Sequence, residues 1–206
     1  MHLTRQEATT RLPIARKGTK YIARAASNPE ISIPVVIAVR DMLGLAKTAK
    51  EVKQMIHQKL LKIDGKDISD IHESICLFDV FHADKDYVLT LSPKKKFQLE
   101  EAKAKSERIA KVAGRNLVSG GKIQIHLHDG TSIIGDSKIK VGDTLHIDFE
   151  NKVKKHISLE KGRDAFIISG KYAGLHGKIE NVHEKKVLVK FKDGSAVLNE
   201  AQAVAL

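Results

Sequence analysis

Three side chains that can bind phosphate, Lys50, Lys53 and His57, are spaced three and four residues apart. Residues at these intervals are neighbours on the surface of an α-helix. A row of ammonium and imidazole groups can neutralise the phosphates of a nucleic-acid backbone, and such contacts supply most non-specific affinity for nucleic acids. The spacing therefore predicts a polyanion-binding face on a helix that covers these positions.

The sequence around this row contains the signals that form and position such a helix. Thr48 and Glu51 form a capping box at its start. Val52, Met55 and Ile56 fall on another face and can pack on a core. We therefore expect an amphipathic helix with one buried face and one basic face.

A second helix is predicted just before it, over the apolar run 33–43. Ser32 is expected to cap this helix, and Pro34 to lie in its first turn, where a missing amide hydrogen costs nothing. Gly44 is expected to end it in the left-handed conformation.

A short strand (60–63) and a tight turn follow the helices. Asp64-Gly65 is a dipeptide that type I′ hairpin turns favour. We predict that this helix–helix–strand unit, residues 33–66, presents a compact basic edge that binds RNA. The cations of its hairpin are Lys62 and Lys66.

The first thirty residues show no sustained periodicity. Their cations are Arg5, Arg11, Arg16, Lys17, Lys20 and Arg24, against Glu7 and Glu30, so six minus two gives a charge of +4. Two interpretations remain open: a solvated, frayed terminus, or an arm that orders only when it neutralises phosphates.

The composition favours a polyanionic partner for the whole chain. Its 206 residues carry a formal charge of +11, and the pI is near 9.6. Aromatic residues make up only 4% and Trp is absent. Base stacking is therefore an unlikely main source of affinity, and phosphate contacts should dominate.

A glycine-rich stretch, residues 170–179, is the most specific short motif. Gly170, Gly174 and Gly177 allow a sharp turn and a close approach to a partner. A phosphate-loop or dinucleotide-binding interpretation fails, because the Lys-Ser/Thr pair is missing and a strand follows where a helix is needed. The cations around this turn are Lys171, His176 and Lys178.

The rest of the chain is predicted to be mostly strands. Two strands are expected over 75–81 and 87–92, then a basic module boundary at Pro93 with Lys94, Lys95 and Lys96, and a helix over 98–112. From Lys122 apolar and polar residues alternate, which predicts a half-buried strand, and Asp129-Gly130 is expected to form a hairpin turn. Further strands are expected near 132–134, 138–141, 144–149 and 152–159. Three last strands are expected at 165–169, 187–192 and 195–198.

These elements predict an α+β, multi-module chain. Its expected parts are a basic N-terminal extension (1–30), a small α/β RNA-binding unit (31–93), a central β-rich, barrel-like domain (94–161) and a C-terminal SH3-like β-barrel (162–206).

No catalytic site, metal site or cofactor is predicted. His126 and His128 with Asp129 could in principle begin a zinc site, but no second cluster supplies the remaining ligands. Cys76 lies in an apolar run and is expected to be a packed core thiol. Asp64, Asp129 and Asp193 each precede glycine, which hairpin turns explain better than acid–base chemistry. Without a membrane-spanning run or a secretory signal, we expect a soluble intracellular protein.

Two of these motifs resemble known RNA-binding elements. Residues 170–179 resemble the KOW motif of ribosomal proteins and transcription elongation factors, a loop on an SH3-like barrel that contacts RNA or protein. Residues 52–57 and 61–66 resemble the second helix and the hairpin of the RNA-binding fold first named for the fourth protein of the small ribosomal subunit.

The order of the modules resembles the eukaryotic and archaeal form of that protein, family S4e, over nearly the whole chain. The segments that carry the resemblance are 2–5, 13–17, 62–66, 128–131, 139–144 and the glycine-rich loop. The chain departs from the family pattern at 171–173 and 196–199 and stops early, which weakens any transfer of C-terminal contacts.

The resemblance implies a structural constituent of the small ribosomal subunit, located in the cytoplasm, whose partners are small-subunit rRNA and neighbouring ribosomal proteins. It implies no membrane and no small-molecule substrate. The alternatives are a non-ribosomal KOW-type transcription or RNA-processing factor and, more remotely, an RNA-modifying enzyme.

Overall fold

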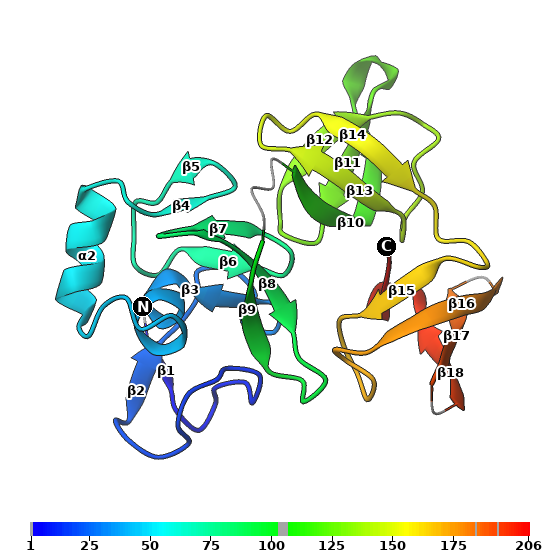
Figure 1. Ribbon diagram of the computed structural model, residues 1–206. Coiled ribbons are helices and arrows are strands. Elements are labelled where there is room, and N and C mark those ends of the chain that lie inside the picture. The colour runs from blue at the N-terminus through cyan, green and yellow to red at the C-terminus, as the bar shows by residue number, and fades with distance from the viewer. Residues whose placement is uncertain (1, 103–106, 184, 193) are drawn as a thin grey trace. The chain divides into compact units, whose positions relative to one another are not determined.

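The computed structural model describes residues 2–102, 107–183, 185–192 and 194–206 (Figure 1). The chain divides into two compact units, one ending at Arg108 and the other beginning at Ile109. Strands dominate both units, so the chain is mostly β with a few short helices. In the described part of the chain, no helix is long and apolar enough to cross a membrane.

The N-terminal segment makes contacts within itself and with the β8–β9 hairpin. A hairpin joins β1 (His2–Thr4) to β2 (Tyr21–Ala23). Leu12 and Ala25 are buried. The amide of Phe97 also donates to the carbonyl of Arg11 at 2.9 Å. Internal pairing and apolar burial therefore contradict a frayed terminus, and an arm that orders only when it neutralises phosphates stays a prediction.

The first predicted helix is shorter and begins later than expected. Ser32 lies in β3 (Ser32–Pro34), which pairs with β6 (Ser74–Cys76), and its hydroxyl donates to the carbonyl of Asn28 at 2.7 Å. Pro34 is the N-cap of α1 (Val35–Ile37), and no side chain caps this helix. The predicted Ser32 cap is wrong because strand pairing extends through Pro34.

A π-helical turn, η1 (Ala38–Met42), continues α1, and Gly44 follows with a φ of 68°, as the sequence predicts. The next helix, α2 (Ala49–His57), begins at the predicted capping box. The Thr48 hydroxyl accepts from the amide of Glu51 at 3.3 Å, and the Glu51 carboxylate accepts from the amide of Thr48. Val52 and Ile56 are buried, which confirms the apolar face.

A five-stranded sheet forms the main core of the first unit. Its order is β5 (Lys66–Asp67), β4 (Lys62–Ile63), β7 (Val80–His82), β8 (Asp86–Leu91) and β9 (Phe97–Glu101). The strand predicted over 75–81 is instead split between β6 and β7, because Phe78 has a φ of 72° and turns the chain between two sheets.

The lysine run does not mark a module boundary. Residues 92–96 form the turn of the β8–β9 hairpin, in which the Ser92 amide donates to the Lys96 carbonyl at 2.8 Å. The sheet continues through Glu101, and the division of the chain follows Arg108.

The helix predicted over 98–112 is wrong as well. β9 and β10 (Glu107–Leu117) cover its described residues, and residues 103–106 lie outside the described part. Leu99 pairs with Leu89 across the β8–β9 ladder, and Ala110 and Val112 of β10 are buried. Sheet pairing therefore outweighs the helix propensity of the Ala, Glu and Lys residues.

The described part of the second unit contains two five-stranded sheets. The first has the order β12 (Ser132–Gly135), β11 (Ile123–Leu127), β10, β13 (Thr144–Asp148) and β14 (Val153–Ile157). Its core includes Ile125, Leu127, Leu145 and Ile147. Residues 138–141, predicted to be a strand, form a loop in which the Lys140 amide donates to the Asp143 carboxylate at 2.9 Å.

The second sheet has the order β18 (Gly194–Asn199), β17 (Lys186–Phe191), β16 (His176–His183), β15 (Asp164–Ile167) and β19 (Ala203–Ala205). A 3₁₀ turn, η3 (Glu200–Gln202), precedes β19. The strands predicted at the C-terminal end are present, and Ala165, Ile167, Val187 and Val189 form the centre of its core.

Candidate nucleic-acid interface

The predicted basic face of α2 is present. Lys50, Lys53 and His57 are exposed, while Val52 and Ile56 on the same helix are buried. The structure therefore brings these three side chains together on one solvent-facing side of a helix whose other side is fixed to the core.

The hairpin after α2 has the predicted turn. Asp64 and Gly65 both have positive φ, 49° and 77°, as a type I′ turn requires. Lys66 is exposed, while Lys62 is half-buried and lies 3.6 Å from the carboxylate of Asp67. Lys66 is therefore more available to a polyanion than Lys62.

Asp64 does more than make the turn. Its Oδ1 accepts from the amide of Val80 at 2.9 Å, and its Oδ2 lies 3.5 Å from the buried guanidinium of Arg108. A second buried carboxylate, Asp79, lies 4.0 Å from the same guanidinium. Arg108 thus joins this turn to the core, a role that the sequence does not reveal.

Two arginines predicted to bind RNA make hydrogen bonds within the N-terminal segment. The Arg5 guanidinium donates to the carbonyls of Thr19, at 2.7 Å, and Ala15. Arg11 donates to the carbonyl of Glu30 at 2.6 Å, and only 13% of its side chain is exposed. These donors are engaged internally, and RNA contact by Arg5 and Arg11 stays a prediction.

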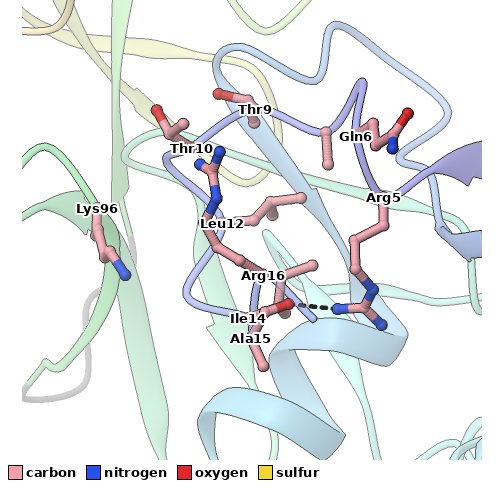
Figure 2. A pocket seen from close by; sticks show the side chains of 10 residues that line it. Arg5, Gln6, Thr9, Thr10, Leu12, Ile14, Ala15, Arg16 and Lys96 are labelled. Carbon is pink, nitrogen blue, oxygen red and sulfur yellow. Dashed lines mark hydrogen bonds between the residues drawn. The ribbon is translucent and has the colours of Figure 1, made fainter. Parts of the chain in front are cut away.

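Arg16 and Lys96, predicted as parts of two separate sites, line one cavity of about 200 Å³ (Figure 2). Figure 2 shows Arg16 extending from the arm toward Thr10, while Lys96 comes from the β8–β9 turn. Leu12 and Ile14 supply an apolar part of the lining. The basic arm and the lysine run are therefore one surface, the arm cavity, which combines cations with hydroxyl and apolar groups.

The remaining cations of the arm and of the lysine turn are exposed. They are Lys17, Lys20, Arg24, Lys94 and Lys95. The ammonium of Lys20 lies 5.2 Å from the centroid of the Tyr21 ring. These side chains extend the basic character of the arm beyond the cavity.

The glycine-rich loop connects β15 to β16. Gly170 and Gly174 have φ values of 86° and 85°, which only glycine adopts without strain. Gly177 has ordinary backbone angles, but an added Cβ would lie 2.5 Å from Cγ1 of Val189. The loop places Lys171, His176 and Lys178 in exposed positions, with the Lys171 ammonium 5.6 Å from the centroid of the Tyr172 ring.

The histidines of β11 make internal hydrogen bonds. The two ring nitrogens of His126 lie 2.8 Å from the Ser132 hydroxyl and 3.1 Å from the Asn116 amide group. The ring of His128 accepts from the amide of Lys111 at 3.2 Å. Among the described residues, no group of three or more His, Cys, Asp or Glu side chains could hold a metal ion.

Two lysines near the glycine-rich loop were not among the predicted site residues. Lys190 and Lys192 line the same cavity as His176 and Lys178. A sequence signal for Lys190 exists in the alternation along β17. Val187 and Val189 are buried, so Lys190 lies on the face opposite the core.

The chain is a basic, mostly β protein that presents cations on several separate elements. These features are typical of proteins that bind a polyanion at several sites. The profile of ribosomal family S4e matches residues 83–153. The small ribosomal subunit protein eS4 of Pyrobaculum aerophilum is 32% identical over 232 residues, which cover 99% of this chain and 95% of that protein. The eS4 of Methanocella arvoryzae is 30% identical over 188 residues, covering 88% and 80%.

A solved structure agrees with these sequence matches. The crystal structure of the 30S ribosomal protein S4e from Thermoplasma acidophilum has a TM-score of 0.73 and 25% identity, covering 85% of this chain and 94% of that one. The chain belongs to ribosomal family S4e.

Proposed function

We propose that this protein is a structural constituent of the small ribosomal subunit that binds small-subunit rRNA. The similarity to proteins named small ribosomal subunit protein eS4 spans nearly the whole chain. The observation that carries RNA binding is the exposed row of Lys50, Lys53 and His57 on a helix whose other face is buried. A fixed helix face with three cationic or titratable groups matches a phosphate backbone without ordering long loops.

Three surfaces supply the proposed RNA contacts. They are the arm cavity with Arg16 and Lys96, the α2 face with the Lys66 hairpin, and the glycine-rich loop with Lys171, His176 and Lys178. Linking three contacts raises the affinity for one long RNA through effective concentration, provided that the geometry allows simultaneous engagement. Neighbouring ribosomal proteins are further partners in this proposal.

We assign the helix–helix–strand segment to the RNA-binding fold of the fourth small-subunit protein, and the C-terminal five-stranded sheet to a KOW-type SH3-like barrel. The positive φ values of Asp64 and Gly65 support the first assignment. The glycine-rich loop between the first two strands of a five-stranded sheet supports the second. No enzymatic role follows from membership in this family.

A non-ribosomal KOW-type RNA-binding factor is the second candidate, and the C-terminal sheet is the feature that favours it. Sedimentation of tagged protein from a cell lysate separates the two functions. We expect the protein to migrate with the small subunit at both moderate and high salt, because many phosphate contacts act together. A pool that remains free, or that migrates with RNA polymerase, contradicts the ribosomal assignment.

A further inference from the structure

An open cavity of about 620 Å³ lies on the C-terminal sheet, where β15, β16 and β17 run side by side. Its size falls within the range of about 300–1,000 Å³ that is typical of small-ligand sites. The residues that matter for its chemistry are Asp164, His176, Lys178, Lys190, Phe191 and Lys192.

The lysines of this cavity come together through the strand register. Lys178 on β16 lies opposite Lys190 on β17 and opposite Asp164 on β15. Lys192 follows two residues after Lys190, and all three lysines are exposed. The Glu180 carboxylate lies 3.6 Å from the Lys190 ammonium, and this ion pair is exposed and therefore weak. The lining thus contains three lysines, the acidic Asp164 and Leu206, the last residue, so lysines outnumber acidic side chains.

Aromatic rings lie next to these lysines. Phe191 stacks on Tyr172 with ring centroids 5.0 Å apart and an interplanar angle of 13°. The ring of His176 contacts that of Phe166 with centroids 4.9 Å apart. The whole chain has three Tyr and six Phe, so this small region holds three of its nine aromatic residues. Of these three rings, Phe191 lines the cavity beside the lysines, whereas Phe166 is buried.

We propose that this cavity binds one unpaired nucleotide of RNA, with the base against Phe191 and the phosphate held by Lys178, Lys190 and Lys192. The inference rests on the proposed RNA-binding function and adds a ligand class to it, since a base inside a duplex cannot reach the ring. Stacking on an aromatic side chain contributes to single-strand affinity with little sequence preference, because every base has a π-face. The α2 face, by contrast, contacts RNA through the backbone.

The test uses the full chain and two RNAs with equal numbers of phosphates. One is a hairpin whose loop contains 2-aminopurine, a base analogue whose fluorescence falls on stacking, and the other is fully paired. We expect quenching in the loop and about tenfold weaker binding of the hairpin to Phe191→Leu, with duplex binding unchanged. Competition with adenosine monophosphate tests whether the site takes a free nucleotide. We expect an RNA with an unpaired nucleotide to displace the probe at micromolar concentration, and adenosine monophosphate not to displace it.

A second variant keeps the test valid if Phe191→Leu folds poorly, because Phe191 packs partly on the core. Lys178→Gln with Lys190→Gln changes only exposed side chains, and it should lower the salt dependence of loop binding by about 1.4 in log–log slope. Lys185→Gln with Lys186→Gln is the matched control, since both lysines are exposed at the far end of β17 and outside the lining. It should leave loop binding nearly unchanged.

Three results overturn the inference: absence of quenching, equal losses for duplex and loop, or equal effects of the cavity and control variants. If these occur while the wild-type protein still migrates with the small subunit, only the nucleotide site fails. If the wild-type protein also fails to bind either RNA and the subunit, the proposed function fails with it.

Discussion

Lys111 places an ammonium group in the interior of the second unit, where only 4% of the residue is exposed. Its Nζ donates to the carbonyl of Ala203 at 2.6 Å and to the carbonyl of Glu200. Burial lowers the pKa of Lys111 to about 8, and the Glu200 carboxylate only partly opposes this change. The side chain therefore links β10 to the turn before β19 while paying a desolvation penalty for its charge.

This depressed pKa predicts a stability that rises with pH. Between about pH 8 and 10.5 the unfolded chain binds a proton that the folded chain has released, so the free energy of unfolding should increase by up to about 1.4 kcal/mol per pH unit. Below pH 8 the penalty for the buried charge is fully present. Urea unfolding of wild type and Lys111→Met from pH 7.5 to 9.5 measures the difference.

Lys138→Met is the control for this measurement, because Lys138 is an exposed lysine in a loop of the same unit. It should keep the wild-type pH slope. Equal slopes for wild type and Lys111→Met would mean that another group titrates in this range.

Gly177 is predicted to be required for packing. A Cβ at this position would lie 2.5 Å from Cγ1 of Val189 and 2.7 Å from the carbonyl oxygen of Lys190, so β16 and β17 would have to separate. Gly177→Ala should destabilise the protein by about 1–3 kcal/mol, the usual cost of overpacking. Gly114→Ala, whose Cβ would approach no closer than 3.8 Å to the His126 ring, should change the unfolding free energy little.

At the scale of elements, α2 gives the most direct test of RNA contact. Lys50→Glu with Lys53→Glu reverses two exposed charges and leaves the buried Val52 and Ile56 unchanged. The variant should bind rRNA more weakly. The slope of log affinity against log salt concentration should fall by about two, because the loss of two phosphate contacts releases fewer counterions. Filter binding at several salt concentrations measures both quantities.

The matched control carries the same change in net charge elsewhere. Lys138→Glu with Lys140→Glu replaces two exposed lysines in the loop between β12 and β13. If the two double variants lower the slope equally, α2 contributes only to the general charge of the protein and makes no specific contact.

Local signals predict some elements well. The capping box fixes the start of α2, and Asp64-Gly65 fixes the turn after β4, because each depends on residues three or fewer positions apart. The alternation after Lys122 likewise predicts β11, whose Ile125 and Leu127 are buried.

Non-local pairing explains the errors. Residues 98–112 have helical composition, but β9 pairs with β8 and β10 lies between β11 and β13. The contacts of Arg108 with Asp64 and of Lys111 with Ala203 span 44 and 92 residues, so no local pattern indicates that these cations are buried. Arg16 and Lys96 are also far apart in the chain, so no local pattern indicates that they line one cavity.

At the scale of the whole molecule, the candidate contacts are distributed over both units. The α2 face and the arm cavity belong to the first unit, and the glycine-rich loop with the C-terminal cavity belongs to the second. Contacts that bind one RNA at the same time contribute free energies that add, whereas contacts that bind alternative RNAs do not reinforce one another.

Combining variants from the two units distinguishes these cases. If both units bind one rRNA together, Lys50→Glu/Lys53→Glu and Lys178→Gln/Lys190→Gln should each weaken binding to intact small-subunit rRNA by about 10- to 100-fold, and the combined variant should lose the product of the two factors. On a short RNA that only one unit can reach, only the double variant of that unit should weaken binding. Filter binding to the intact rRNA and to fragments provides the comparison. A combined variant no weaker than the poorer double variant would show that the two units do not bind the same RNA simultaneously, and that linkage adds nothing to the affinity.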